Sequence, residues 1–201
     1  MWHPDPEDIF EEFCKYVDGK LNWAAMKDKE WTDTVFGFFA ELTKKQSPSL
    51  STNERLDEEG EGGRNYMTVD YVVRGYTLDG ERRRYQHIIL AVEHENTGDV
   101  PSFLKNEIRH LVDLKARTKI AITYPSYGDR EDLFTGVQQL IQDSSFWGTL
   151  KSLDERYLVI LGFTTTKDGG RAIEWQGRIF SMQGELVKQL RKVVFQTTKA
   201  T

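Results

Sequence analysis

The sequence predicts an α/β domain in which a mixed β-sheet is flanked by helices. Two strand-like segments, 66–76 and 84–93, are joined through an Asp-Gly turn, which is typical of an antiparallel hairpin. An amphipathic helix over 103–117 then leads into the compact apolar segment 119–124. Such a helical crossover places its two strands parallel and right-handed, so both kinds of pairing are expected in one sheet.

The elements before the hairpin follow from helix start and stop signals. Asp5, Pro6 and Glu7 have the order of an N-cap, a proline at the first helical position and an acidic first turn. Apolar residues at helical spacing extend this first helix toward residue 19. A second helix is expected over 31–45, because Ser-Pro-Ser follows it. The polar, glycine-rich stretch that comes next predicts a short strand at most.

The second half of the chain continues the alternation of helices and strands. We expect a helix over 129–143, a buried strand over 157–163, an alternating strand over 172–182 and a final amphipathic helix over 184–195. We expect one domain over 1–201, with a core at about 31–124 and a C-terminal α/β extension at about 125–201.

Composition narrows the class of protein. The chain of 201 residues contains 5 Trp, 8 Tyr and 11 Phe, which favours a packed core over disorder. Cys14 is its single cysteine, so no internal disulfide can form and a reducing, cytoplasmic setting is expected. No apolar run approaches 18 residues, and the acidic N-terminus does not resemble a signal peptide. The net charge of -5 argues against a protein that coats nucleic acid non-specifically.

The most informative motif is Glu93-His94-Glu95, which ends the apolar run 85–92. On a strand, side chains at i and i+2 share a face, about 6–7 Å apart at Cα. Two such carboxylates at the exit of a buried strand suit a hard cation. The alternative is that the strand simply ends here and Glu95 is solvated.

Asp70 lies in a segment otherwise built of Val and Tyr, where an acid needs a partner. With 80–83 as a four-residue loop, Asp70 would lie directly opposite Glu93. A two-residue loop at 79–80 would instead place it opposite an apolar side chain. An ion pair with Arg74 is the alternative role for this carboxylate.

This order of residues and elements resembles the PD-(D/E)xK nuclease superfamily over about 31–124. Asp70 matches the first acid of its motif and Glu93 the second, while Glu95 stands at the position of the lysine. Glu-x-Glu occurs among restriction endonucleases of that superfamily. The resemblance also implies an accessory acid on the first core helix, for which Glu41 is the candidate.

The resemblance implies a nuclease that uses Mg²⁺ or Mn²⁺ to hydrolyse phosphodiester bonds in nucleic acid. As the partner, DNA is favoured over RNA. Asp70, Glu93 and the backbone carbonyl of His94 would hold the ion, and Glu95 would orient a water or hold a second ion. Lys105 or Arg109 would supply to the phosphate the positive charge that the motif lysine of the superfamily provides and that Glu95 cannot.

Two other functions remain open from the sequence. Val69 stands where the family has proline, and the lysine is absent, so the chain can also be an inactive nuclease-like module that binds nucleic acid or a protein. A third alternative is an adaptor whose carboxylates are structural. In a nuclease or in an inactive module that binds nucleic acid, the run Arg82, Arg83 and Arg84 would contact phosphates. In an adaptor it would be a solvated turn. Self-association stays open.

Overall fold

The computed structural model of the protein describes residues 2–18, 28–46, 50–54, 69–79, 82–147, 155–167 and 170–195. Its centre is one seven-stranded sheet whose strands lie side by side in chain order. Neighbours pair antiparallel except in the centre, where β3, β4 and β5 run parallel. The strands are β1 (Leu50–Glu54), β2 (Tyr71–Asp79), β3 (Arg82–Glu95), β4 (Ala116–Thr123), β5 (Arg156–Lys167), β6 (Gly170–Ser181) and β7 (Leu186–Phe195).

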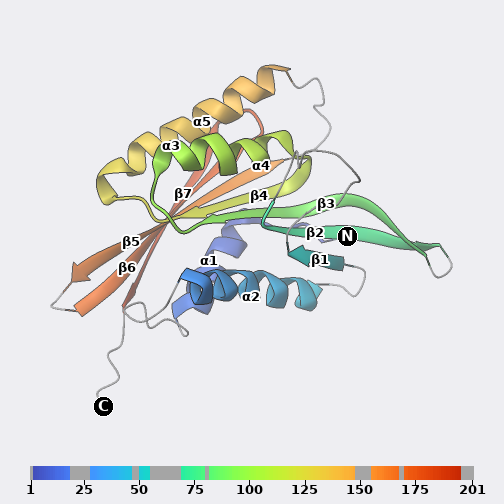
Figure 1. Cartoon of the computed structure of the whole chain (residues 1–201), viewed down its shortest axis with the longest axis horizontal. Helices are drawn as coiled ribbons and strands as arrows, with labels where there is room; N and C mark the ends of the chain where they lie inside the picture. The colour runs from blue at the N-terminus through green and yellow to red at the C-terminus, as the bar shows by residue number, and fades with distance from the viewer. Residues whose placement is uncertain are drawn as a thin grey trace, which may run out of the picture.

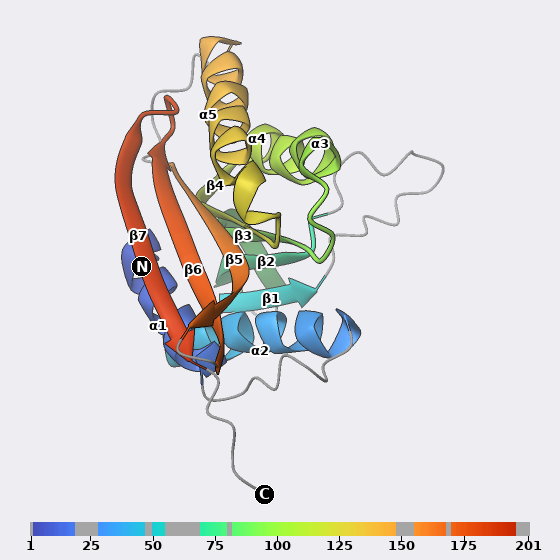
Figure 2. The same ribbon diagram turned by 90° about the vertical axis from the view of Figure 1, so that its left-hand side faces the viewer.

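Helices cover both faces of this sheet, so the predicted α/β class is confirmed (Figure 1). One face carries α1 (Pro6–Asp18) and α2 (Asp28–Gln46), and the other carries α3 (Val100–Phe103), α4 (Arg109–Asp113) and α5 (Arg130–Trp147). Each face has its own apolar cluster, because alternate residues of the central strands point to opposite sides. Figure 2 shows how the sheet twists from β1 to β7 between these two layers.

The N-terminal helix forms as its capping signal predicts. The Asp5 carboxylate accepts hydrogen bonds from the backbone N–H groups of Glu7 at 2.8 Å and Asp8 at 3.4 Å, and Pro6 opens α1. The helix then packs Phe10 and Phe13 against the sheet. The predicted helix ends near 19 and 47–49 lie outside the described residues, as do 55–68 and the hairpin turn at 80–81.

Strand β3 is central and buried, as its unbroken apolar run predicts. Leu90 and Val92 have no solvent exposure, and Ile89 has 1%. The helical crossover after β3 does return the chain parallel to it, with Glu93 beside Ala121 of β4. The predicted helix begins earlier, at Val100, and includes the π-helical turn η1 (Leu104–Ile108) before α4.

The hairpin register differs from the expected loop. Asp79 pairs with Arg82, so two residues separate the strands as in the shorter alternative, but one position later than the predicted 79–80. Two irregularities, between Val73 and Arg74 and between Gly75 and Tyr76, shift the pairing by one residue each. They bring Tyr71 opposite Val92, which places Asp70, just before β2, beside Glu93.

The predicted helix over 184–195 is wrong, because this segment is the edge strand β7. Gly184 has φ 76°, a left-handed conformation, and its N–H donates to the Ser181 carbonyl at 2.9 Å. This tight turn returns the chain antiparallel onto β6. Leu190 and Val194 have helical spacing, but they also share one face of a strand, and there they pack against the α1–α2 side.

Among the described residues, no helix has the length and apolar character needed to cross a membrane.

Candidate metal centre

Glu93 is a buried carboxylate on the central strand. Its exposed fraction is 0%, and it faces the side of the sheet that α3 and α4 cover. The Asp70 backbone N–H donates to Glu93 Oε2 at 3.3 Å. The His94 backbone N–H in turn donates to Asp70 Oδ2 at 2.9 Å. The start of β2 and the end of β3 therefore hold these two acids against each other.

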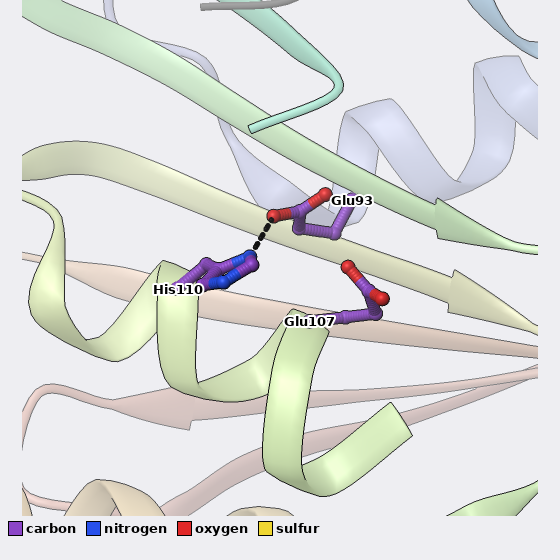
Figure 3. A group of neighbouring side chains, drawn as sticks. All are labelled: Glu93, Glu107 and His110. Atoms are coloured by element: carbon purple, nitrogen blue, oxygen red, sulfur yellow. Dashed lines mark hydrogen bonds and ion pairs between the residues drawn. The ribbon is translucent and has the colours of Figure 1, made fainter. Parts of the chain in front are cut away.

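The helical layer adds two ligand-type side chains to Glu93. Glu107 is part of the π-helical turn η1 and His110 is part of α4. Their potential ligand atoms lie within 4.8 Å of one another and of a Glu93 carboxylate oxygen. His110 Nδ1 is 3.2 Å from Glu93 Oε1. Figure 3 shows all three side chains converging between β3 and the helix that crosses it.

The electrostatics of this group favour a bound positive charge. Burial, with the neighbouring charges of Asp70 and Glu107, raises the pKa of Glu93 to about 10. Burial, Asp70 and Glu95 raise the pKa of Glu107 to about 7. At neutral pH the buried carboxyl of Glu93 therefore holds a proton unless a cation replaces it.

Glu95 lies at the rim of this group. It is half-buried at the end of β3, and its carboxylate accepts the Thr97 backbone N–H at 2.8 Å. Its charge still acts on Glu107, so the two glutamates of the motif lie on the same side of the sheet. His94 points to the opposite face, as strand alternation predicts, and its Nε2 is 2.9 Å from the Tyr124 hydroxyl. Burial lowers the pKa of His94 to about 3, so the ring is neutral there.

The predicted accessory residues are not gathered at this group. Lys105 and Arg109 have exposed side chains, and each lies two positions from Glu107, roughly half a turn around the helix. Glu41 lies on α2, on the other side of the sheet, where its carboxylate accepts the Tyr16 hydroxyl at 3.4 Å.

The backbone of the three hairpin arginines, Arg82, Arg83 and Arg84, lies farther along β3, and their side chains are outside the part of the chain that the structure describes. Arg84, the nearest in sequence, precedes Glu93 by nine residues, about 30 Å at ~3.3 Å per residue. The tip of the hairpin formed by β2 and β3 extends beyond the helices in Figure 1. Among the described residues, no lysine or arginine forms an ion pair with Glu93 or Glu107.

The sequence reasoning missed Glu107 and His110. The apolar stripe of the segment identifies the buried face of the helix, and among its charged residues the prediction selected Lys105 and Arg109 as phosphate contacts instead. The missed signal is the three-residue spacing at the edge of that stripe, which puts both side chains on one side of a helix. That helix directly follows a strand ending in acids, so the pair was a candidate for the same site.

The donor set fits a divalent cation. Two carboxylates and an imidazole from rigid elements offer oxygen and nitrogen ligands, and Asp70 lies next to them. Carboxylates suit Mg²⁺ and Mn²⁺, while an imidazole shifts the preference toward first-row transition ions. The deprotonated forms of Glu93 and Glu107 that an ion requires are those that burial disfavours in its absence.

Comparison with known proteins does not place the chain in a family. No protein-family model matches it, and no curated protein sequence does. The chain resembles the crystal structure of the central domain of yeast acetyl-CoA carboxylase, with a TM-score of 0.41 and 10% sequence identity. The match covers 92% of this chain but 30% of the carboxylase chain, so this chain spans less than a third of that length.

Proposed function

We propose that this protein is a metal-dependent nuclease that uses Mg²⁺ or Mn²⁺ to hydrolyse phosphodiester bonds in nucleic acid, with DNA favoured over RNA as the nucleic acid. The observation that carries the proposal is the buried carboxyl of Glu93, within 4.8 Å of ligand atoms of Glu107 and His110 and in contact with Asp70. An ionised acid this buried on a central strand destabilises the fold unless a positive charge compensates it, and a bound cation would do so. The resemblance to the PD-(D/E)xK superfamily supplies the reaction.

Each residue has a distinct part in this proposal. Glu93, Glu107 and His110 would bind the ion, with Asp70 and the His94 carbonyl as further oxygen ligands from the strand side. A bound ion polarises a phosphate and lowers the pKa of a bound water. Glu95, at the partly exposed rim, would accept the proton of the attacking water.

A specific observation favours a second candidate function. Within the described part of the chain, no lysine or arginine forms an ion pair with Glu93 or Glu107, so no cation stands at the position of the lysine of the superfamily motif. A nuclease-like module that has lost catalysis would show the same feature. Such a module would bind nucleic acid or a protein without cleaving anything.

Metal dependence separates the two functions. A labelled duplex and a labelled single strand are titrated with the protein in chelator, in Ca²⁺, and in Mg²⁺ or Mn²⁺. We expect weak binding in chelator, tighter binding in Ca²⁺ and cleavage in Mg²⁺ or Mn²⁺, because the unneutralised acids repel phosphate. Tight binding that ignores metal, with no cleavage, would support the inactive module.

Variants assign the activity to the site. Glu93→Gln should abolish cleavage. Glutamine has the same shape as glutamate but is neutral, so it cannot replace the charged carboxylate as a ligand of the ion. Glu185→Gln makes the same chemical change at an exposed position between β6 and β7 and should leave cleavage unchanged. Full cleavage by Glu93→Gln would place the chemistry elsewhere on the chain.

A further inference from the structure

A polar groove lies on the same face of the sheet as the metal centre. It has a volume of about 280 Å³ and lies between the first turns of α5 and strands β6 and β7. Three arginines line it: Arg130 from α5, Arg178 from β6 and Arg191 from β7. Gln176 and Gln189 line it as well, and the Gln189 side chain is exposed. Guanidinium and amide groups are the donors that phosphate oxygens accept.

The register of the sheet places this groove in line with Glu93. Glu93 pairs with Ala121, Ala121 pairs with Val159, and Val159 pairs with Arg178. The four side chains of this row all lie on the face that α4 and α5 cover. At ~4.8 Å between strands, Arg178 is roughly 14 Å from Glu93 at Cα. About four phosphates of one DNA strand, at ~3.4 Å each, span that interval.

The Arg191 guanidinium is oriented by a carboxylate and remains accessible. Its Nε and Nη2 donate to the two oxygens of Glu174, each at 2.8 Å. The Glu174 side chain is 9% exposed, whereas that of Arg191 is 65% exposed. Within the described part of the chain, Nη1 of Arg191 has no acceptor. The buried carboxylate therefore leaves donors of the guanidinium for a ligand.

Arg130 and Arg178 each lie over an aromatic ring. The guanidinium carbon of Arg130 is 4.0 Å from the centroid of Tyr127, a ring that is 51% exposed. That of Arg178 is 4.1 Å from the centroid of Phe134, and its Nη2 donates to both oxygens of Glu131 at 2.7 and 2.8 Å. Stacking orients a planar guanidinium without using its N–H donors.

Positive charge is in excess in this groove. Its three guanidiniums form ion pairs with two carboxylates: Glu131 is 3.6 Å from Arg130 and 2.7 Å from Arg178, and Glu174 pairs with Arg191. One positive charge is left over, although the whole chain carries a net charge of -5. Each phosphodiester carries a negative charge, so the groove is complementary to a phosphate backbone.

We propose that the groove between α5 and strands β6 and β7 binds the phosphate backbone of nucleic acid. This inference rests on the proposed function, because the groove would hold the same strand that passes the metal centre, about four nucleotides from the phosphate that is cleaved. The contacts would be to phosphates, so they would add affinity and position the strand without reading its bases.

The salt dependence of binding measures these contacts without cleavage. The full-length protein is titrated with a labelled single strand and a labelled duplex, in chelator and in Ca²⁺, over a series of KCl concentrations. Arg191→Gln should weaken binding about tenfold at low salt, as expected for one charge-assisted hydrogen bond. It should also lower the slope of log affinity against log salt by roughly one. Arg130→Gln, which leaves the buried Glu174 paired, should have the same two effects.

Lys192→Gln is the matched control. Lys192 is exposed and directly follows Arg191, but strand alternation sends it to the opposite face of β7. The substitution removes one positive charge from nearly the same place on the chain. It should leave both the affinity and the salt slope nearly unchanged.

The outcomes separate this inference from the proposed function. Weaker and less salt-dependent binding by Arg191→Gln and Arg130→Gln, in a protein that cleaves nothing with any metal, would retain the groove and reject the nuclease. Metal-dependent cleavage with an unchanged salt slope in both variants would keep the nuclease and overturn the groove. An equal loss in Lys192→Gln would also overturn it, because only overall charge would matter.

A competitor distinguishes nucleic acid from an acidic protein as the occupant. Polyglutamate, at the same concentration of negative charge, should displace the labelled strand only weakly, because guanidiniums spaced for a phosphate backbone do not match a flexible polycarboxylate. Displacement by polyglutamate as effective as that by unlabelled nucleic acid would overturn the proposal in favour of an acidic protein partner.

Discussion

Oε1 of Glu93 lies 3.2 Å from Nδ1 of His110, although one residue comes from the central strand and the other from the helix that covers it. The Glu93 side chain is 1% exposed and that of His110 is 30% exposed, so the pair runs from the core toward solvent. Rigid elements on both sides fix the distance between the two groups. His110 is therefore the member of the pair that lies nearer to solvent.

The nitrogen of His110 predicts a preference among metals. The protein should bind Mn²⁺ more tightly than Mg²⁺, because Mg²⁺ is better served by oxygen ligands alone. His110→Ala should reduce Mn²⁺ affinity by at least about tenfold, because it removes a proposed ligand and even the loss of a supporting group costs about that much. Mg²⁺ affinity should change less. Electron paramagnetic resonance of free Mn²⁺, with Mg²⁺ as competitor, measures both.

A neighbouring residue provides the control for this measurement. Arg109→Ala alters the same helix at an exposed position, on the side away from Glu107. It should leave the affinity for Mn²⁺ in solution nearly unchanged. Equal losses of Mn²⁺ and Mg²⁺ affinity in His110→Ala would show that the imidazole is not an ion ligand and acts only by positioning Glu93.

The raised pKa of Glu93 predicts how stability depends on pH. Burial first, and then the nearby acids, raise this pKa from 4.5 to about 10, so the fold favours the protonated carboxyl. Its stabilising contribution is complete below the unfolded value of 4.5 and is lost as pH rises toward 10. The free energy of unfolding of the metal-free protein should therefore fall across the neutral range, by at most about 1.4 kcal/mol per pH unit from this group.

Two comparisons isolate that contribution. Glu93→Gln resembles the protonated state at every pH, so the difference from the unaltered protein should grow with pH. Saturating Mn²⁺ should flatten the profile of the unaltered protein, because the ion replaces the proton. Thermal unfolding from pH 5 to 9, with and without Mn²⁺, tests both. Parallel profiles for the two proteins in chelator would contradict the assignment.

The fold was largely predictable from the sequence, and the exceptions have physical causes. The apolar run ending at Glu93 requires a buried strand, and the amphipathic helix after it requires a parallel return. The hairpin register was not predictable by counting from its turn, because two bulges together move the pairing by two residues. The apolar spacing of the segment after Gly184 fits both a helix and one face of a strand, so it does not decide between them. The tight turn at Gly184 decides for the strand.

The candidate site was predictable only from its strand side. Local sequence identifies Asp70 and Glu93 because acids in apolar strands are unfavourable. Glu107 and His110 are three residues apart at the edge of the apolar stripe, which makes them candidates, and the packing of that helix onto β3 decides that they turn inward. The same limit applies to Lys105 and Arg109, which the sequence alone could not distinguish from inward-facing residues.

Gly162 in β5 predicts a specific sensitivity of the core. A Cβ there would lie 2.7 Å from Cζ3 of Trp175 and 2.8 Å from Cδ1 of Tyr124, two aromatic rings within the packed core. Gly162→Ala should therefore destabilise the protein by about 1–3 kcal/mol, as expected for overpacking. Gly128→Ala is the control, because its Cβ would meet only Ser126 Oγ at 3.7 Å. Urea unfolding of both variants measures the difference, and equal stability would contradict this packing.

The role of Asp70 can be separated into two effects with opposite signs. Its charge raises the pKa of both Glu93 and Glu107, so removing it makes these ligands easier to ionise. Removing it also deletes an oxygen ligand if Asp70 binds the ion. Asp70→Asn keeps an oxygen that can accept the His94 N–H, so the local backbone contact survives.

The pH dependence of Mn²⁺ affinity in Asp70→Asn tells these effects apart. At neutral pH the affinity lost with the Asp70 ligand is partly recovered, because Glu93 and Glu107 ionise more easily without its charge. Above pH 10 both glutamates are ionised in either protein, so nothing is recovered. We expect affinity to fall at every pH, with the loss growing as pH rises. Asp132→Asn, an exposed change on α5, should alter affinity little. A variant that binds Mn²⁺ more tightly than the unaltered protein at pH 7, and equally at high pH, would show that Asp70 acts only through its charge.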